Sequence, residues 1–143
     1  MEKVFWRNEY SVGVELFDRQ HKHLLEITNK LAAQSDTLPD VNLISQILNE
    51  MYDCAEKHFT DEEKLMQQYA YPEIESQKKQ HAYFLKTVTE LAAYPTNEKQ
   101  ECVDEIAEFL NIWWIIHFLK WDMKYKEFFE AKLPAHTAAY TSA

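Results

Sequence analysis

Apolar residues recur every three or four positions along most of the chain, and this spacing is the period of an α-helix rather than of a β-strand. Prolines interrupt the pattern four times, and proline is excluded from helix interiors, so each interruption marks a predicted turn. The prolines are Pro39, Pro72, Pro95 and Pro134. The pattern predicts helices over about residues 18–37, 41–69, 72–93 and 97–120, with Asp18 as the N-cap of the first.

Short connections between these helices favour antiparallel packing of neighbours, so the predicted fold is all-α, an up-down-up-down antiparallel four-helix bundle. Residues 1–17 lack the helical period and are expected to form an irregular N-terminal arm. Residues 134–143 are expected to form a tail of small residues. At 143 residues the chain is long enough to bury a core of its own, so we expect one domain over residues 1–143.

Composition narrows the functional classes. The chain has one glycine, which is too few for a Gly-rich phosphate-binding loop. It has 15 basic and 24 acidic residues, a net charge of −9, so we expect no nucleic-acid partner. No segment approaches the roughly 20 apolar residues of a membrane span, and the N-terminus is charged, so we expect a cytoplasmic protein without membrane insertion. Cys54 and Cys102 are predicted to be buried thiols rather than a disulfide or a zinc pair.

Several polar residues lie on the apolar stripes that should face the core. The histidines among them are His21, His58, His81 and His117. The two histidines expected to be solvated are His23 and His136. Glu62 also lies on a stripe, one helical turn after His58. A buried carboxylate without a partner costs several kcal/mol of desolvation, so Glu62 is expected to be protonated, paired or bound to a cation.

Helix lengths place these histidines near one level of the bundle. At a rise of ~1.5 Å per residue, His21 and His58 lie ~27 and ~28 Å from the first turn. His58 and His81 lie ~16–18 Å from the second turn. The match from the third turn is looser, because His117 lies ~20 residues along its helix and His81 only ~14 residues back. Four imidazoles sharing one carboxylate cannot satisfy one another by hydrogen bonds, whereas a metal site resolves the excess of acceptors.

A single core histidine, or the i, i+4 pair of His58 and Glu62, is often only a hydrogen-bonded part of a core, so the metal hypothesis depends on the whole constellation. Asp122 is expected to complete it. Because Asp122 follows His117 by five residues, it cannot share the helical face of His117, and we expect it to swing inward where the helix ends, at Lys120 or Trp121. Imidazoles with two carboxylates suit one or two first-row transition ions.

These residues resemble the hemerythrin family, and in particular its single-domain bacterial members, the bacteriohemerythrins, from Trp6 to about Phe129. The matching segments are W-R-N-E-Y-S-V-G-V at 6–14, F-D-R-Q-H at 17–21, H-F-T-D-E-E at 58–63, Y-P at 71–72 and H-x-x-x-x-D at 117–122. By contrast, the HExxH motif and the paired Glu-x-x-His motifs of ferritin-like di-iron bundles are absent.

The resemblance implies two Fe ions in a carboxylate-bridged, oxo- or hydroxo-bridged di-iron centre that binds O₂ reversibly. In this assignment Glu62 and Asp122 bridge the irons. His21 and His58 serve the iron where O₂ binds, and His81 and His117 serve the other. That second iron usually takes a third histidine, and Gln77 stands in its place. Three outcomes are open: Gln77 ligates through its side-chain oxygen, Gln77 holds a water that fills the gap, or the iron is five-coordinate.

A second departure from the family is Trp114, which stands where a leucine-like residue usually lines the O₂ pocket. The expected pocket residues are Trp114, Trp113 and Phe59. The larger indole of Trp114 could narrow the pocket and slow ligand entry, although both tryptophans could equally be ordinary core aromatics. Trp121, beside Asp122, could shield the site from water or only pack against its neighbours.

Four functions are compatible with these residues. The leading hypothesis is an O₂-binding protein for storage, transport or delivery, acting as a monomer, with an oxygen-consuming enzyme as a conceivable recipient. The alternative is a peroxidase-like or O₂-reducing di-iron centre that takes peroxide, because Gln77 opens the usually saturated iron. An O₂ or redox sensor would need a separate output partner. The fourth hypothesis is a structural bundle with a vestigial or zinc-filled site.

Overall fold

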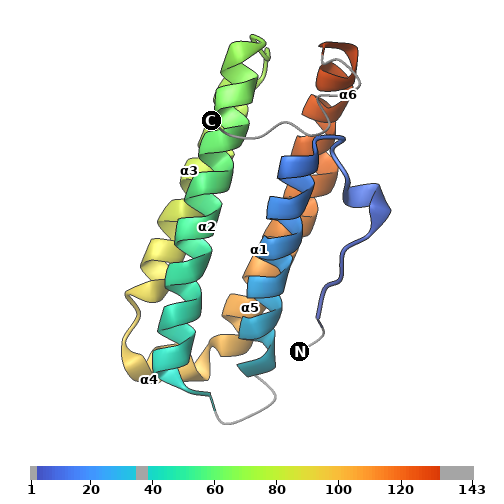
Figure 1. Ribbon diagram of the computed structural model, residues 1–143. Coiled ribbons are helices and arrows are strands. Elements are labelled where there is room, and N and C mark those ends of the chain that lie inside the picture. Colours follow the sequence, from blue (N-terminus) through green and yellow to red (C-terminus); the bar gives the residue numbers. More distant parts are fainter. Residues whose placement is uncertain (1–2, 35–38, 133–143) are drawn as a thin grey trace.

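The structure, a computed structural model, describes residues 3–34 and 39–132 and is all-helical over these residues (Figure 1). Its main helices are α1 (Glu15–Ala33), α2 (Val41–Gln68), α3 (Ile74–Ala92), α4 (Thr96–Glu101), α5 (Val103–Ile116) and α6 (Met123–Lys132). A short 3₁₀ turn, η1 (Asn8–Tyr10), lies in the N-terminal arm, and a π-helical turn, η3 (His117–Asp122), joins α5 to α6. The predicted all-α class is confirmed.

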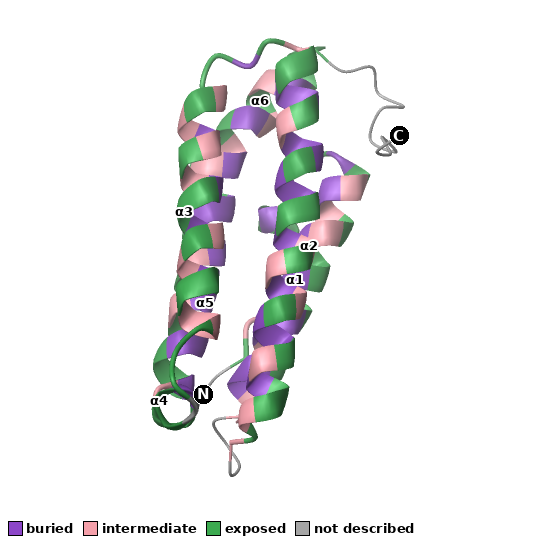
Figure 2. Cartoon of the chain, turned by 90° about the vertical axis from the view of Figure 1, so that its left-hand side faces the viewer, coloured by how far each residue is buried: buried purple, intermediate pink, exposed green. Residues whose placement is uncertain are grey.

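The four long segments run alternately up and down the bundle (Figure 1). α1 packs against α2 and α5, and α2 packs against α3. The short helix α4 lies at the end of the bundle where α3 connects to α5. Buried residues of each helix face the bundle interior and exposed residues face outward, as the amphipathic pattern requires (Figure 2). The predicted four-helix bundle is confirmed.

The N-terminal arm is irregular, as predicted, and is fastened to α1 and to the α5–α6 segment. The backbone N–H of Val4 donates to Asn29 Oδ1 at 2.9 Å, and Asn29 Nδ2 donates to the Val4 carbonyl at 2.7 Å. Trp6 and Tyr10 pack on each other at 5.8 Å between ring centroids, and Tyr10 packs on Phe118 at 5.9 Å. The arm therefore covers the side of the bundle on which Phe118 lies.

The start of the first helix differs from the prediction. α1 begins at Glu15, three residues early, and Asp18 lies inside it. Instead of capping the helix, the Asp18 carboxylate accepts hydrogen bonds from Ser11 Oγ at 2.6 Å and from the backbone N–H of Val12 at 2.9 Å. Gly13, at φ +77°, makes the turn between arm and helix, a conformation that glycine adopts without steric cost. Asp18 thus fastens the arm to α1.

The ends of the second and third helices agree with the pattern to within about two residues. α2 spans Val41–Gln68 against the predicted 41–69, and α3 spans Ile74–Ala92 against 72–93, so Pro72 lies in the turn before α3. The predicted last residues of the first helix, 35–37, and the predicted tail, 134–143, lie outside the described residues.

The prediction of one fourth helix over residues 97–120 is wrong. The segment breaks at Cys102 into α4 and α5, and it continues past residue 120 through η3 into α6. The extension is stable because Tyr125 and Phe129 are buried in a second apolar cluster with Val12, Phe17 and Leu65. Residues of the arm, α1 and α2 supply this cluster, so the helical pattern of the fourth segment alone did not reveal it.

Two expectations from composition can be compared with the structure. Over residues 3–34 and 39–132, no helix is both long and apolar enough to cross a membrane. Cys54 and Cys102 are free, as expected, but each is half-buried, so the prediction of buried thiols is wrong. Burial and neighbouring acidic groups raise the pKa of both thiols above the usual value, which makes them poor nucleophiles near neutral pH.

Candidate metal centre

Four helical segments each bring one predicted histidine to the same place inside the bundle. His21 of α1, His58 of α2, His81 of α3 and His117 at the start of η3 are all buried. The Nε2 atoms of His21 and His58 are 2.8 Å apart, and the rings of His81 and His117 are 5.3 Å apart between centroids. The histidines therefore form two pairs at one level. The helix lengths predicted this level for His21, His58 and His81, and only loosely for His117.

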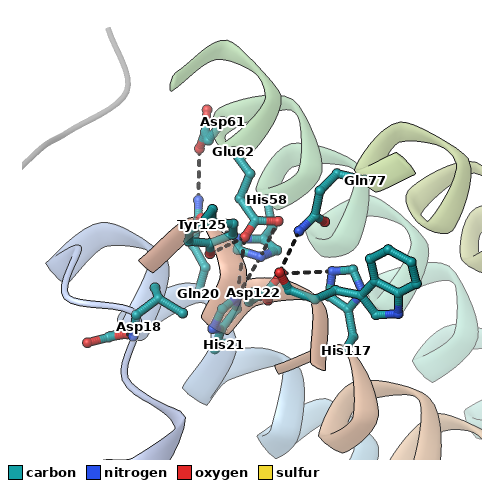
Figure 3. A network of polar contacts seen from close by, with 12 residues as sticks. Asp18, Gln20, His21, His58, Asp61, Glu62, Gln77, His117, Asp122 and Tyr125 are labelled. Carbon is teal, nitrogen blue, oxygen red and sulfur yellow. Dashed lines mark hydrogen bonds and ion pairs between the residues drawn. The ribbon is translucent and has the colours of Figure 1, made fainter. Parts of the chain in front are cut away.

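The two carboxylates lie among these histidines, and Figure 3 shows Glu62 and Asp122 close to His21, His58 and His117. Glu62 Oε1 is 3.1 Å from His58 Nε2 and 3.4 Å from His81 Nε2. Asp122 Oδ1 is 3.0 Å from His117 Nε2, and Asp122 Oδ2 is 3.4 Å from His21 Nε2. Each carboxylate thus contacts imidazoles of both pairs.

The π-helical turn η3 directs Asp122 into the core. In an α-helix, residues five apart differ by about 140° around the axis, so Asp122 would point away from the face of His117. A π-turn pairs residues i and i+5 and so places residues five apart on one face. The predicted position of Asp122 agrees with the structure, but the predicted cause, a helix end at Lys120 or Trp121, is wrong.

A chain of hydrogen bonds fixes the ring of His58. His58 Nδ1 is 2.6 Å from Gln20 Oε1, and Gln20 Nε2 donates to Asp61 Oδ2 at 2.8 Å. Lys57 Nζ lies 3.2 Å from the same Asp61 oxygen. Since a carbonyl oxygen can only accept, His58 Nδ1 carries the proton and its Nε2 lone pair faces Glu62 and His21.

His81 is oriented in the same way by Glu63, whose Oε2 lies 2.7 Å from His81 Nδ1. Carboxylates that hold the outer nitrogen of an imidazole fix its tautomer and raise its basicity as a ligand. Sequence reasoning included Gln20, Asp61 and Glu63 in the motif segments but gave them no role. Their position directly beside the candidate ligands was the available signal.

Tyr125 of α6 is a further residue of the centre that sequence reasoning missed. Its hydroxyl donates a hydrogen bond to Glu62 Oε2, and its side chain is fully buried. The prediction ended the fourth helix at residue 120, which removed Tyr125 from consideration. The signal was present, because Tyr125 and Phe129 are separated by one helical turn.

Burial and mutual contact shift the pKa values of the centre in opposite directions. Burial would raise the pKa of Glu62, but His58, His21 and His81 together lower it well below the usual value. Burial and the neighbouring Glu62 raise the pKa of Asp122 well above its usual value. Burial lowers the pKa of His117 to about 4. At neutral pH, His117 therefore presents a neutral imidazole, the form that ligates metals.

Orphaned polar atoms at the centre indicate that a cation fits it. Several buried side-chain atoms at the centre have no hydrogen-bond partner among the described residues. They are His21 Nδ1, Glu62 Oε1, Gln77 Oε1, His81 Nε2, both ring nitrogens of His117 and both Asp122 oxygens. Lone pairs of neighbouring imidazoles and carboxylates facing each other repel unless a proton or cation lies between them. Two three-residue groups, His21–His58–Glu62 and Glu62–His81–His117, each hold their ligand atoms within 4.8 Å of one another. Each group could therefore hold a first-row transition ion, and Glu62 belongs to both groups.

Gln77 lies at the centre and its amide orientation is fixed. Gln77 is buried, and its Nε2 donates to the carbonyl oxygen of Trp121 at 3.0 Å. That carbonyl belongs to the π-turn and can only accept, so the nitrogen of the amide must face it. The side-chain oxygen of Gln77 is consequently the atom left without a partner among the described residues.

The three expected pocket residues pack closely around the histidines. Phe59 stacks on His81 at 3.9 Å between ring centroids, and Trp113 stacks on His117 at 4.4 Å. Trp114 is fully buried and lies 5.7 Å from Phe59, so its indole fills the core beside the centre. The role of these residues as walls of an O₂ pocket stays a prediction.

Comparison with known proteins agrees with the observed fold and with a cation-binding site. The family described as "Hemerythrin HHE cation binding domain" matches residues 12–129. The chain is 26% identical over 133 residues to a bacteriohemerythrin of Stenotrophomonas maltophilia, covering 93% of this chain and 86% of that protein. It is 29% identical over 125 residues to a myohemerythrin of Theromyzon tessulatum, covering 87% and 92% of the two chains. A crystal structure of a leucine-to-phenylalanine mutant shares the fold, with a TM-score of 0.75, 24% identity and coverage of 89% of this chain and 97% of that one.

Proposed function

The chain belongs to the hemerythrin family, and from this premise we propose that it holds two iron ions and binds O₂ reversibly. At the level of the family it is a non-haem iron, oxygen-binding protein. Iron would supply the site at which O₂ binds and from which it leaves. The proposal assigns His21 and His58 to one iron and His81 and His117 to the other. In this assignment Glu62 and Asp122 would be shared by the two irons.

One observation carries this proposal: Glu62 belongs to both three-residue groups of candidate ligands. A structural zinc site needs one closed set of four ligands, and the histidines here divide into two pairs around shared carboxylates. The arrangement favours two ions side by side over a single ion.

The other residues of the chain prepare this site. Gln20 and Glu63 hold the protons on the outer nitrogens of His58 and His81, so the inner nitrogens are free to ligate. Tyr125 holds one oxygen of Glu62. Trp114 packs near His58 and Phe118 stacks on His21, so these apolar rings would keep water away from an iron held there and would slow its irreversible oxidation.

Two measurements test the proposal. Metal analysis of protein expressed in iron-replete medium should give two irons per chain. Reduced, iron-loaded protein exposed to air should develop a ligand-to-iron charge-transfer band that disappears on deoxygenation. One zinc per chain, or a band that persists after O₂ is removed, would contradict reversible O₂ binding by a di-iron centre.

A second candidate function is peroxide or O₂ reduction, and Gln77 is the observation that favours it. An amide oxygen is a weaker ligand than an imidazole, so the iron beside Gln77 is more open to exogenous ligands. Gln77→His should then lower turnover with peroxide by about tenfold or more while the iron content is unchanged. Equal turnover in Gln77→His and wild type would remove this function from consideration.

The proposal extends to physiology as O₂ storage, transport or delivery to an oxygen-consuming enzyme by a cytoplasmic monomer. A net charge of −9 opposes self-association and supports the monomer. Sedimentation of the iron-loaded chain tests this, because a dimer at micromolar concentration contradicts it. Fractionation of the source cells tests the compartment.

A further inference from the structure

The outer face of α5 and η3 differs from that of an ordinary bundle helix, because its middle is apolar where residues facing the solvent are expected to be polar. The exposed fractions of its large apolar side chains are 50% for Ile112, 51% for Ile116 and 46% for Leu119. Phe109 and Trp113 are half-buried beside the two isoleucines and line the same surface pocket. A contiguous exposed apolar patch with a polar rim is typical of an interaction surface.

Charged residues flank these isoleucines, and the sign of the charge differs at the two ends. Glu105 and Glu108 precede the isoleucines, Lys120 and Lys124 follow them, and all four charged side chains are exposed. Within residues 3–34 and 39–132, Glu105, Glu108 and Lys120 form no ion pair, and Lys124 forms an exposed ion pair of 3.5 Å with Glu73. The outer surface of this segment is therefore acidic at one end, apolar in the middle and basic at the other end.

The charged residues and the isoleucines lie on one side of the segment. At 3.6 residues per turn, positions 105, 108, 112 and 116 fall within about 80° of one another around the axis of α5. The π-turn η3 keeps Lys120 and Lys124 on that outer side, because both lysines are exposed and Asp122 between them is buried. We call this row of residues the α5 stripe, and its members are Glu105, Glu108, Ile112, Ile116, Lys120 and Lys124.

The α5 stripe is complementary to its own reverse. Counted from residue 114, the isoleucines lie two positions away on either side, and the inner charges, Glu108 and Lys120, lie six positions away. The outer charges, Glu105 and Lys124, lie nine and ten positions away. A two-fold axis at this midpoint would therefore place each glutamate of one copy opposite a lysine of a second copy, and the isoleucines of the two copies opposite one another.

We propose that the α5 stripe binds a second copy of this chain, with the two α5 helices antiparallel about a two-fold axis. The charges set the direction, because parallel packing would place like charges opposite one another. The same surface serves both copies, so Glu108 of each copy lies opposite Lys120 of the other. The isoleucines form the apolar centre of the interface and the charged residues form its rim.

The dimer is weak, because its interface is small and the net charge opposes it. One face of one helix per copy is expected to bury less than the roughly 1,200–2,000 Å² of specific, stable interfaces. Each copy also carries a net charge of −9. We expect a dissociation constant on the order of several hundred micromolar. At micromolar concentration the chain is then the monomer of the proposed function.

Charge reversal at the inner pair tests the inference by sedimentation equilibrium of the full-length chain from about 20 µM to about 1 mM, a range that brackets the expected dissociation constant. Wild type should be monomeric at the low end and largely dimeric at the high end. Glu108→Lys and Lys120→Glu each place like charges opposite one another, so each variant alone should dimerise about tenfold more weakly. An equimolar mixture of the two variants should dimerise as strongly as wild type, because each inner contact then joins one basic and one acidic side chain.

The mixture also separates these contacts from the effect of net charge. The two variants carry −9 + 2 = −7 and −9 − 2 = −11, so their mean is the −9 of wild type. Glu56→Lys, at an exposed position of α2 outside the α5 stripe, is the control with the same charge change as Glu108→Lys and should not weaken dimerisation. The inference is overturned by a wild-type chain that stays monomeric at the highest concentration, by a mixture that associates no better than its components, or by equal weakening in Glu56→Lys and Glu108→Lys.

Discussion

Removing the hydroxyl group of Tyr125 tests whether α6 is part of the metal centre. Tyr125 is fully buried and donates to Glu62 Oε2, whose other near neighbour is His21 Nε2 at 3.7 Å. Tyr125→Phe keeps the ring and its packing against Phe17, at 6.1 Å between centroids, and deletes only the donor. The Glu62 carboxylate, which its histidine neighbours keep ionised, then loses a hydrogen bond without access to water.

The expected cost follows from the charge of the acceptor. A hydrogen bond to an ionised group contributes about 1.5–3 kcal/mol, so Tyr125→Phe should lower the free energy of unfolding of the metal-free chain by about 2 kcal/mol. For a chain of this size that is a loss of about 4–8 °C in Tm. In a Glu62→Gln background the acceptor is neutral, and the same substitution should cost only about 1 kcal/mol.

Urea unfolding in the presence of a chelator, followed by far-ultraviolet circular dichroism, measures these values. Tyr94→Phe, which removes a hydroxyl from a partly exposed ring, is the control and should change the free energy of unfolding by less than about 0.5 kcal/mol. A loss of that small size for Tyr125→Phe, or equal losses in the wild-type and Glu62→Gln backgrounds, would refute the contact between α6 and Glu62.

Three further predictions concern His117, Ala70 and Gln20. Burial lowers the pKa of His117 to about 4 from 6.5, so its contribution to the stability of the metal-free chain is present above pH 6.5 and lost as the pH falls toward 4. Relative to His117→Phe, the wild-type free energy of unfolding should fall by about 3 kcal/mol over that window, and parallel urea profiles would contradict this. Ala70 has φ +53° just after α2, so Ala70→Gly should raise the free energy of unfolding by about 1 kcal/mol, and a lower Tm would show that the position is not strained. Gln20→Ala should weaken iron binding about 10–100-fold in competition with a chelator by freeing His58 Nδ1, whereas exposed Gln67→Ala should not.

The four-helix fold and its inward-facing polar residues could be predicted from the sequence because both depend on the local geometry of a helix. Prolines divide the chain into helices, and the period of 3.6 identifies the inward face of each. Four histidines and Glu62 stand out because each is polar on such a face. The contact of His21, His58, His81 and Glu62 in the structure needs only straight helices and a known rise per residue. The position of His117 depends in addition on the break between α4 and α5.

Contacts between segments were less accessible from the sequence. The spacing of Tyr125 and Phe129 indicates one more helical turn, but no local pattern shows that residues of the arm, α1 and α2 bury them. Gln20 and Glu63 lie beside ligands in sequence, yet which imidazole nitrogen each one holds depends on the rotation of α1 and α3 against α2. Asp18 binds Ser11 and Val12 of the arm instead of capping α1, and this too depends on how the arm packs against α1.

Two departures from a regular helix adjust the last segment, one along the axis and one around it. His117 lies ~20 residues beyond the third turn, whereas His81 lies ~14 residues before it, a mismatch of about 9 Å in a continuous helix. The six residues of α4 lie at the end of the bundle, and 14 residues then separate Val103 from His117, as 14 separate His81 from Pro95. α4 thus sets the height of His117. η3 sets the angle, because the extra residue of a π-turn brings Asp122 back to the face of His117, and its Trp121 carbonyl is the group that orients Gln77. A helical period of 3.6 residues predicts neither the break at α4 nor the π-turn η3. The sequence could therefore identify the candidate ligands of this segment, but not the backbone conformation that places them at the centre.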